Sequence, residues 1–513
     1  MALAYYFKVY FQEKNNKPEN TRTNSRVYNG KTIYLKNFFL LSVVLLSFQY
    51  GYSQSPYHIK VKLTPYKNSR VYLGYYYGKI KALADSAMLD ASSSGTFKGK
   101  ERLPGGIYFM VSPKKEILFE ILIDKVQNFS IVADSSGIPD KIAFLGSEDN
   151  TLFQSYTRFM AKDGKEIEET KSILAGARSK EDSAHISNRI KQLNVEVQDY
   201  RNEIEKKYPQ SILASLLKTL KEPVVPAPDK KAGNPRDSLF AYHYFRSHYW
   251  DGISFTDERL IRTPIFEPKL DKYFKDLVPP EPDSINREAD RMLLESRTNK
   301  EMFKYLLIYF VQKYINPEYM GQDAVFVHLF EKYINVGQAD FFTEKYRKFV
   351  NDRAYSLMAN LIGLPASNLL MTDTSEQPQQ LYDIEARFTV ICFWDPTCSH
   401  CKEIVPKLDS IFQNKWKAEG IKLVGVMVDG GKEAWLKFIR DHNLKDWIHV
   451  YQTQSQHDAE TAGDKPSYKQ LYDVYQTPIL YLLDKDKRII AKKLGYQQFD
   501  EVINLKLQLN KTK

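Results

Sequence analysis

The chain has 513 residues, which is too many for a single hydrophobic core, so its length predicts about three domains. Its residues are 43% hydrophobic, 27% charged and 13% aromatic, with 23 Gly and 23 Pro, which excludes collagen-like, low-complexity and wholly disordered chains. Half of the net charge of +10 lies in residues 1–36, which contain seven basic and two acidic side chains. Nucleic-acid binding requires a clustered basic face on the folded protein, so no nucleic-acid partner is expected.

Residues 1–54 have the features of a secretory signal peptide with an extended N-terminal preamble. A basic region precedes the uncharged, mostly apolar run at 37–48, and small and polar residues follow at 51–54. Because a transmembrane helix needs about 20 apolar residues, this shorter run predicts cleavage near Ser53 or Gln54 rather than a membrane anchor. The residue directly after the predicted cleavage point is not a cysteine, so lipid attachment is not expected.

Residues 55–150 are predicted to form an antiparallel β-sandwich or barrel-like domain. Ile59, Val61 and Leu63 alternate with polar residues, as they would on a strand with one buried face. Further apolar runs are separated by turn-forming stretches such as the Pro-Gly-Gly at 104–106. The region contains no cysteine and no cluster of acids or histidines, so we interpret it as a docking or spacer module.

Residues 151–355 are predicted to form an all-α domain that is interrupted by the Pro-rich loop 221–238. The stretch 165–207, rich in Glu, Lys and Ala, predicts one or two long amphipathic helices. We interpret the aromatic block at 240–250 as helix core and interdomain packing, although such a block also suits a carbohydrate or peptide groove. Asp323 is expected to be the N-cap of a later helix.

The motif that carries chemistry lies in the last third of the chain. The cysteines are Cys392, Cys398 and Cys401, too few for a disulfide framework. A buried-strand run at 388–394 leads through the turn 395–397 into the Cys-Ser-His-Cys motif at 398–401, which begins a predicted helix. Unpaired N–H groups and the positive end of the helix dipole stabilise a thiolate at this position.

The order of the motif assigns a role to each of its reactive side chains. We expect Cys398 to attack a partner disulfide and Cys401 to resolve the mixed disulfide that forms. His400 is expected to lower the pKa of Cys398 and to make the pair more oxidising. Cys392, with apolar neighbours on both sides, is interpreted as a buried core thiol.

Motifs around the cysteine pair carry a family resemblance. They are Phe393-Trp394 before the pair, Lys402 and Pro406 after it, and Thr477-Pro478-Ile479 downstream. With these motifs, residues 362–513 resemble a thioredoxin-fold domain of the secreted TlpA/ResA type. The resemblance implies an α/β thioredoxin fold in which a cis Thr477-Pro478 peptide faces the cysteines. It also implies that this peptide, together with Trp394, binds the substrate chain.

The segment between the two motifs fits the alternating order of that fold. The predicted elements are a strand at 423–428, a helix at 432–441, a strand at 447–451 and a helix at 468–475. A final helix is expected from about Gln498. One departure concerns a glutamate that the family often carries three residues after the second cysteine, with a proton-handling role. Ile404 occupies that place here, and Glu403 lies about 100° away around the helix.

The resemblance implies an exported thiol-disulfide oxidoreductase of the protein-disulfide reductase or isomerase type. Its partners would be disulfide-bearing proteins and a membrane or periplasmic thiol that donates electrons, and no cofactor is expected. The implied location is the periplasm or cell envelope of a Gram-negative bacterium. Residues 57–150 and 240–334 are similar to modules that precede thioredoxin domains in exported bacterial envelope proteins. The direction of electron flow and the oligomeric state stay open.

Three other interpretations of the cysteine motif are weighed against disulfide exchange. The cysteine pair could be half of a zinc site, but such a site needs four ligands. The remaining cysteine lies on a predicted strand, so no metal is expected. The Pro-Thr-Cys at 396–398 also suits a thiol peroxidase, although the second cysteine of the pair favours exchange. Finally, the large upstream part suits a binding protein that uses a thioredoxin domain as a scaffold with little redox turnover.

Overall fold

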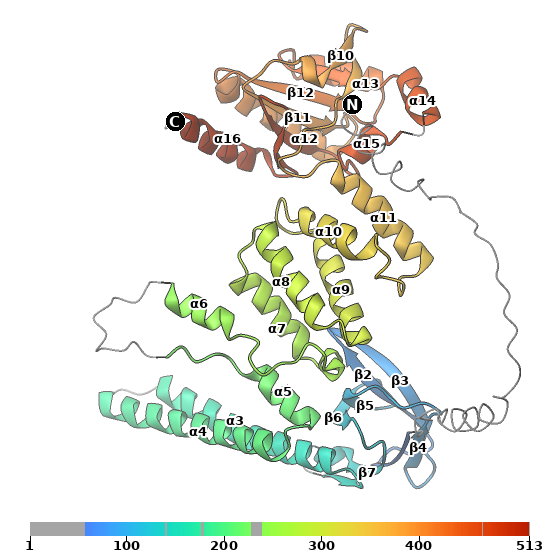
Figure 1. Cartoon of the computed structure of the whole chain (residues 1–513), viewed down its shortest axis with the longest axis vertical. Coiled ribbons are helices and arrows are strands. Elements are labelled where there is room, and N and C mark those ends of the chain that lie inside the picture. The colour runs from blue at the N-terminus through green and yellow to red at the C-terminus, as the bar shows by residue number, and fades with distance from the viewer. Residues whose placement is uncertain (1–56, 139–140, 176–178, 227–238, 464, 512–513) are drawn as a thin grey trace, which may run out of the picture. The chain divides into compact units, whose positions relative to one another are not determined.

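A computed structural model describes residues 57–138, 141–175, 179–226, 239–463 and 465–511 (Figure 1). All the described residues belong to one compact unit. The predicted signal peptide at 1–54 lies outside the described residues. None of the helices within the described ranges combines the length and the apolar character needed to cross a membrane.

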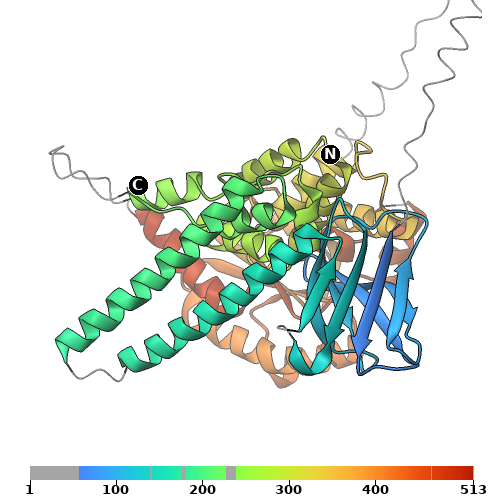
Figure 2. The ribbon, with the colours of Figure 1, turned by 90° about the horizontal axis from the view of Figure 1, so that it is seen from below.

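The N-terminal region is built from two four-stranded sheets (Figure 2). The strands are β1 (His58–Thr64), β2 (Arg70–Tyr77), β3 (Ile80–Met88), β4 (Ser94–Lys98), β5 (Gly106–Val111), β6 (Ile117–Ile123), β7 (Asn128–Asp134) and β8 (Ile142–Leu145). One sheet has the order β4-β1-β7-β8 and the other β3-β2-β5-β6. Alternate residues of β1, namely Ile59, Val61 and Leu63, are buried in a cluster that both sheets share, as the period-two pattern predicts.

Two details of the predicted β domain are corrected. Strands β1 and β7 pair in parallel, with Ile59 opposite Phe129, so the first sheet is mixed rather than antiparallel. The chain crosses to the other sheet and back twice before it forms β7, and such crossovers allow a parallel return. In the described residues the two sheets stay separate, so the expected barrel-like closure is not observed.

The middle region is helical, as predicted. Its helices are α3 (Glu148–Ala175), α4 (Lys180–Lys207), α5 (Ile212–Leu220), α6 (Phe240–Ser247), α7 (Phe266–Lys272), α8 (Pro282–Glu295), α9 (Lys300–Tyr314), α10 (Asp323–Leu329) and α11 (Glu344–Met358). The stretch predicted to hold one or two long helices is covered by α3 and α4. Leu213, Leu216 and Leu217 of α5 pack with Ile107 and Phe109 of β5, so the helical and β-rich regions share a hydrophobic cluster.

The expected capping role of Asp323 is wrong. Gln322 occupies the N-cap position, and Asp323 lies in the first turn of α10, where it is buried. Its carboxylate pairs with Lys492, a residue that is distant in sequence. The local pattern of an acid before an apolar run is the same for a cap and for a first-turn acid, so sequence alone could not separate the two.

The C-terminal region is an α/β structure around one seven-stranded sheet of order β10-β9-β13-β12-β11-β14-β15. The strands are β9 (Leu370–Asp373), β10 (Pro378–Gln380), β11 (Phe388–Trp394), β12 (Ile421–Met427), β13 (Ile448–Tyr451), β14 (Ile479–Asp484) and β15 (Ile489–Lys492). The helices are α12 (Ser399–Ile411), α13 (Lys432–Asp441), α14 (Gln454–Ala462), α15 (Tyr468–Leu471) and α16 (Tyr496–Lys511). The helix expected at 468–475 ends earlier than predicted, and α14 was not predicted.

Short 3-10 and π turns complete the described elements. They are η1 (Ser135–Gly137), η2 (Glu258–Arg262), η3 (Tyr273–Leu277), η4 (Phe330–Ile334), η5 (Leu381–Asp383) and η6 (Phe412–Trp416). Together the elements confirm the predicted order of a β-rich region, a helical region and a C-terminal α/β region.

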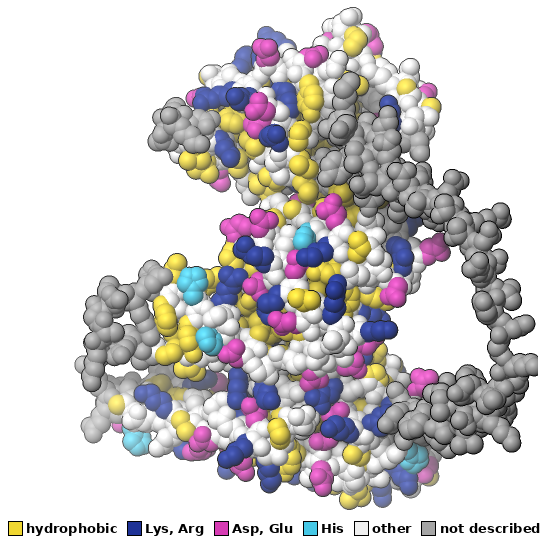
Figure 3. Space-filling view, in the orientation of Figure 1, with side chains coloured by type: hydrophobic (Ala, Val, Ile, Leu, Met, Phe, Trp, Pro, Cys, Tyr) yellow, Lys and Arg dark blue, Asp and Glu magenta, His cyan; other side chains and the backbone are white. Residues whose placement is uncertain are grey.

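On the face shown in Figure 3, Lys and Arg side chains are interspersed with Asp and Glu side chains, so that face carries no large patch of one sign.

Strand β11 lies in the interior of the C-terminal sheet, and its side chains contribute to the hydrophobic clusters on both faces. It pairs in parallel with β12 and antiparallel with β14. Cys392 and Trp394 face a cluster formed with α12, α13 and α16, while Ile391 and Phe393 face the cluster on the other side. Because all residues of β11 are buried, the strand provides a rigid base for the turn that follows it.

Candidate active site

Cys398 occupies the N-cap position of α12, directly after the turn that follows β11. No side chain caps this end of the helix, so the N–H groups of its first turn remain available to a negative group. Those N–H groups and the positive end of the helix dipole favour a thiolate on Cys398. Cys398 is half-buried and Cys401, one turn further along, is fully buried. The structure thus has the predicted order of strand, turn and helix at the cysteine pair.

The two cysteines of the pair differ in acidity. A hydrogen bond from the Cys401 backbone is the largest of the effects that lower the pKa of Cys398 below its ordinary value. Burial raises the pKa of Cys401 to about 11. One thiol therefore ionises readily at the protein surface while the other stays protonated beneath it. Such an arrangement suits a nucleophile and a resolving thiol.

This difference in pKa predicts selective alkylation. Iodoacetamide reacts with thiolates, so at about pH 8 we expect rapid modification of Cys398 and slow modification of Cys401 in the folded chain. Peptide mass spectrometry after a short exposure measures each site, and the pH at half-maximal rate for Cys398 is expected to fall below the ordinary pKa of 9.0. Modification of Cys401 ahead of Cys398 would contradict the assignment of nucleophile and resolver.

The loop between α15 and β14 lies against Cys398. The Thr477-Pro478 peptide is cis, as the resemblance implies. The Cys398 Sγ lies 3.7 Å from the Thr477 carbonyl oxygen, to which the thiol donates a hydrogen bond. Thr477 also forms a hydrogen bond with Cys401, which lowers the pKa of that thiol and partly offsets the effect of its burial. The fold therefore brings Cys398, Cys401 and Thr477 together from two distant parts of the sequence.

The other two predicted site residues have different surroundings. His400 is exposed, and its backbone, rather than its imidazole, is among the groups that lower the pKa of Cys398. Trp394 is fully buried and packs against Phe438, with ring centroids 5.2 Å apart. Its predicted contact with a substrate is therefore not met, because β11 directs this side chain into the core beneath α12.

Asp395 shapes the turn before the cysteine pair, a role that the sequence analysis missed. Its carboxylate accepts hydrogen bonds from the N–H and the hydroxyl of Thr397, each 2.7 Å long. Its carbonyl oxygen accepts a hydrogen bond of 3.3 Å from the Cys398 N–H. A Cβ atom at Gly430, where φ is +92°, would come within 2.3 Å of the Asp395 carboxylate, so the neighbouring loop needs glycine there. The Asp-x-Thr spacing is the sequence signal of such an Asx turn.

Two more residues near the pair are accounted for by packing and surface pairing. Cys392 is fully buried, and burial raises its pKa far above the ordinary value, so it is the core thiol that its neighbours predict. The Glu403 carboxylate accepts a hydrogen bond of 2.6 Å from Lys407, which lowers the pKa of Glu403. Among the described residues, no three His, Cys, Asp or Glu side chains are grouped in a way that could hold a metal ion.

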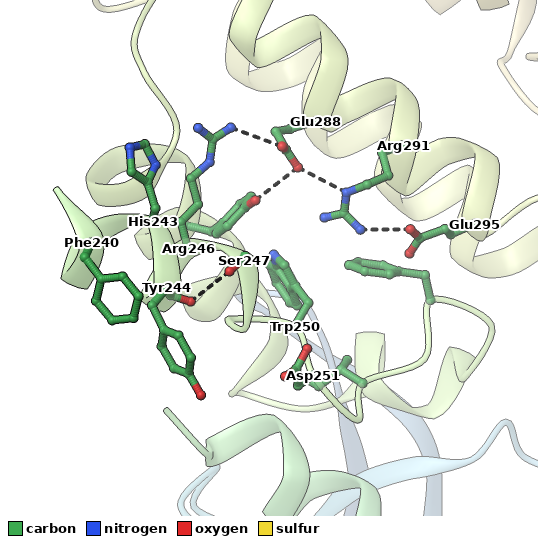
Figure 4. Close-up of a pocket in the computed structure, with 13 residues that line it drawn as sticks. Phe240, His243, Tyr244, Arg246, Ser247, Trp250, Asp251, Glu288, Arg291 and Glu295 are labelled. Atoms are coloured by element: carbon green, nitrogen blue, oxygen red, sulfur yellow. Dashed lines mark hydrogen bonds and ion pairs between the residues drawn. The ribbon is translucent and has the colours of Figure 1, made fainter. Parts of the chain in front are cut away.

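A pocket of about 820 Å³ lies in the helical region (Figure 4). Charged side chains that line the pocket pair with one another: the Glu288 carboxylate accepts hydrogen bonds of 3.1 Å from both Arg246 and Arg291. The aromatic block contributes Tyr244 and Trp250 to the wall, and Trp250 also belongs to the helical core. The end of the block, Tyr249 and Trp250, therefore has the predicted core role, whereas α6 itself contains no buried residue and borders the pocket. The described residues that line this pocket include no cysteine, so it contributes no thiol chemistry.

Two parts of the chain match known protein families. Residues 386–489 match a family described as thioredoxin-like. Residues 197–356 match a domain of unknown function, DUF5106. The first match contains the cysteine pair and the Thr477-Pro478 loop, and the second contains most of the helical region.

Individual relatives match the C-terminal part of the chain. Thiol-disulfide oxidoreductase ResA of a Bacillus cereus strain is 23% identical over 141 residues, which cover 28% of this chain and 74% of that protein. ResA of Bacillus subtilis is 22% identical over 133 residues, covering 26% of this chain and 67% of that protein. A solved domain of a possible thiol-disulfide isomerase from Cytophaga hutchinsonii is 38% identical and covers 30% of this chain and 97% of its own, with a TM-score of 0.27. The structure of a thioredoxin-like protein from Bacteroides caccae is 22% identical and covers 56% of this chain and 99% of its own, with a TM-score of 0.42.

Proposed function

We propose that this chain, which is a thioredoxin-like oxidoreductase of the TlpA/ResA type, exchanges disulfides with protein partners through Cys398 and Cys401. We further propose that it acts outside the cytoplasm, in the periplasm or cell envelope, after export directed by residues 1–54. A membrane or periplasmic thiol would return electrons to the pair. In this proposal residues 55–150 and 151–355 are separate domains upstream of the catalytic domain at 362–513.

The proposed reaction transfers two electrons in two thiol-disulfide exchanges. The Cys398 thiolate attacks one sulfur of the partner disulfide, which forms a mixed disulfide and releases the other partner sulfur as a thiolate. Cys401 then loses its proton and attacks the Cys398 sulfur, which forms the Cys398–Cys401 disulfide and releases the second partner thiol. The partner is reduced and the pair is oxidised. Run in reverse, the same steps oxidise a partner dithiol.

The observation that carries this proposal is the placement of Cys398. Its sulfur sits at an uncapped helix N-terminus, and its pKa is lowered by hydrogen bonding to the backbone. The same sulfur lies beside the carbonyl oxygen of Thr477, which belongs to a partly exposed loop. A partner chain that lies along this loop would bring its disulfide to the nucleophile. A scaffold without redox turnover would need neither the lowered pKa nor the buried second thiol.

The proposal predicts a trapped intermediate. Replacing the resolving thiol by Cys401→Ala should let mixed disulfides accumulate through Cys398, because the second exchange can no longer occur. Incubation of the purified variant with an oxidised protein disulfide such as insulin, followed by non-reducing electrophoresis and mass spectrometry, measures the adduct. The double variant Cys398→Ser/Cys401→Ala is the matched control and should form none. Equal adduct in both variants, or none in either, would remove the basis for the assigned roles.

A further inference from the structure

Helix α11 of the helical region docks on the segment that leads into the Thr477-Pro478 loop (Figure 1). The Ser356 hydroxyl donates a hydrogen bond of 2.6 Å to the Gln470 carbonyl oxygen. Just beyond the helix, the Asn360 amide donates one of 3.0 Å to the Leu471 carbonyl oxygen. These bonds hold the backbone at the C-terminal end of α15, so the start of the loop is fixed from outside the C-terminal region.

Arg353 adds a charged connection between the same two regions. Its guanidinium forms an ion pair with Asp473, a residue that is only 2% exposed and that also pairs with Lys493. These two cations hold the pKa of Asp473 below its ordinary value despite its burial. The guanidinium is itself held within the helical region, where it donates hydrogen bonds of 3.3 Å to the Ile315 carbonyl oxygen and 3.1 Å to the Asn316 side chain. Arg353 thus connects the Ile315 and Asn316 end of α9 in the helical region to the buried Asp473 that precedes the loop.

The segment after Asp473 has two different parts. Asp473 is buried, whereas Tyr475, two residues later, is 71% exposed and lies under the Arg353 guanidinium, 5.9 Å from ring centre to cation. Thr477, which contacts the nucleophile, is only two residues beyond Tyr475. A buried anchor, an exposed aromatic ring and the loop therefore follow one another within five residues. Displacement of the anchor would move the ring and the loop together.

We propose that Arg353 is a positioning residue for partner docking: through Asp473 it holds Tyr475 and the Thr477-Pro478 loop in the arrangement that a protein substrate contacts beside Cys398. The helical region is then part of the substrate-binding apparatus rather than a spacer. This inference rests on the proposed disulfide exchange. A substrate chain lies along the Thr477 backbone and against the Tyr475 ring, whereas a small disulfide needs only access to the Cys398 sulfur.

The difference between large and small substrates provides the test. We expect Arg353→Ala to lower kcat/KM for the reduction of insulin disulfides about tenfold, mainly through KM, since a small displacement of a docking loop carries a large kinetic cost. Reduction of the small disulfide dithiobis(nitrobenzoate) should stay within about twofold of the unmodified protein. Arg353→Lys, which retains the cation, should restore most of the insulin activity. Ser356→Ala, a milder change at the same contact, should lower insulin kcat/KM in the same direction by about threefold.

Lys348→Ala is the matched control, because Lys348 lies on the same helix, is exposed and pairs only with Asp352 among the described residues. It should leave both substrates unaffected. If Arg353→Ala and Ser356→Ala both retain unmodified insulin kcat/KM, or if both substrates decline in parallel in Arg353→Ala, the positioning role is wrong while the proposed function stands. If the unmodified protein reduces neither insulin nor dithiobis(nitrobenzoate), the proposed function itself fails.

Discussion

Cys398→Ser is expected to lower the rate of disulfide reduction by at least about a thousandfold, because a serine hydroxyl does not ionise near neutral pH and cannot form a disulfide. The side chain sits where the helix and the backbone favour an anion, but only the thiol has a pKa close enough to the working pH to respond. Insulin reduction with dithiothreitol as the electron donor measures the rate, with the uncatalysed reaction subtracted.

Cys392→Ala is the control for this experiment. It removes a cysteine from the same domain, but one that is fully buried with a raised pKa, so the activity of the folded variant should stay close to that of the unmodified protein. Retention of activity in Cys398→Ser would refute the assignment of the nucleophile. Loss of activity in a folded Cys392→Ala variant would instead show that the wrong cysteine had been chosen.

The core of this site could be predicted because its signals are local in sequence. A buried strand, a turn and the Cys-x-x-Cys spacing fix where Cys398 and Cys401 lie relative to a helix start, since each element follows from its own pattern of residues. The approach of Thr477 to Cys398 is a long-range contact, and it was available only through the family resemblance. Trp394 shows the limit of that transfer, because a matching motif says nothing about which way a side chain on a buried strand faces.

The connections between regions had no signal in the sequence. Arg353 and Asp473 are 120 residues apart, and Asp323 and Lys492 are 169 residues apart. In the sequence, each of these residues is an ordinary charged position on an expected helix, strand or loop. The parallel pairing of β1 and β7 was missed for the same reason, since strand direction depends on the path of the whole intervening chain.

The buried pair of Lys492 and Asp323 joins the edge strand β15 to the helical region. Both side chains are nearly inaccessible, with exposed fractions of 3% and 6%. The Lys492 ammonium also donates hydrogen bonds of 2.7 and 2.6 Å to the backbone and side-chain oxygens of Asn360. Burial lowers the pKa of Lys492, and the carboxylate of Asp323 opposes that effect. The charge of each residue is therefore tolerated in the interior because of its partner.

Lys492→Met is therefore expected to lower the free energy of unfolding by about 3–5 kcal/mol, because it leaves the Asp323 carboxylate buried without its cation. Denaturant unfolding followed by tryptophan fluorescence measures the change, since four of the five tryptophans lie in the C-terminal region. Adding Asp323→Leu should recover most of the loss, since an apolar pair replaces a buried charged pair at little cost. Lys437→Met, which breaks an exposed pair with Asp441, should leave the unfolding midpoint unchanged within the error of the measurement. Equal effects of the two lysine variants would mean that the buried pair stabilises the fold no more than an exposed pair does.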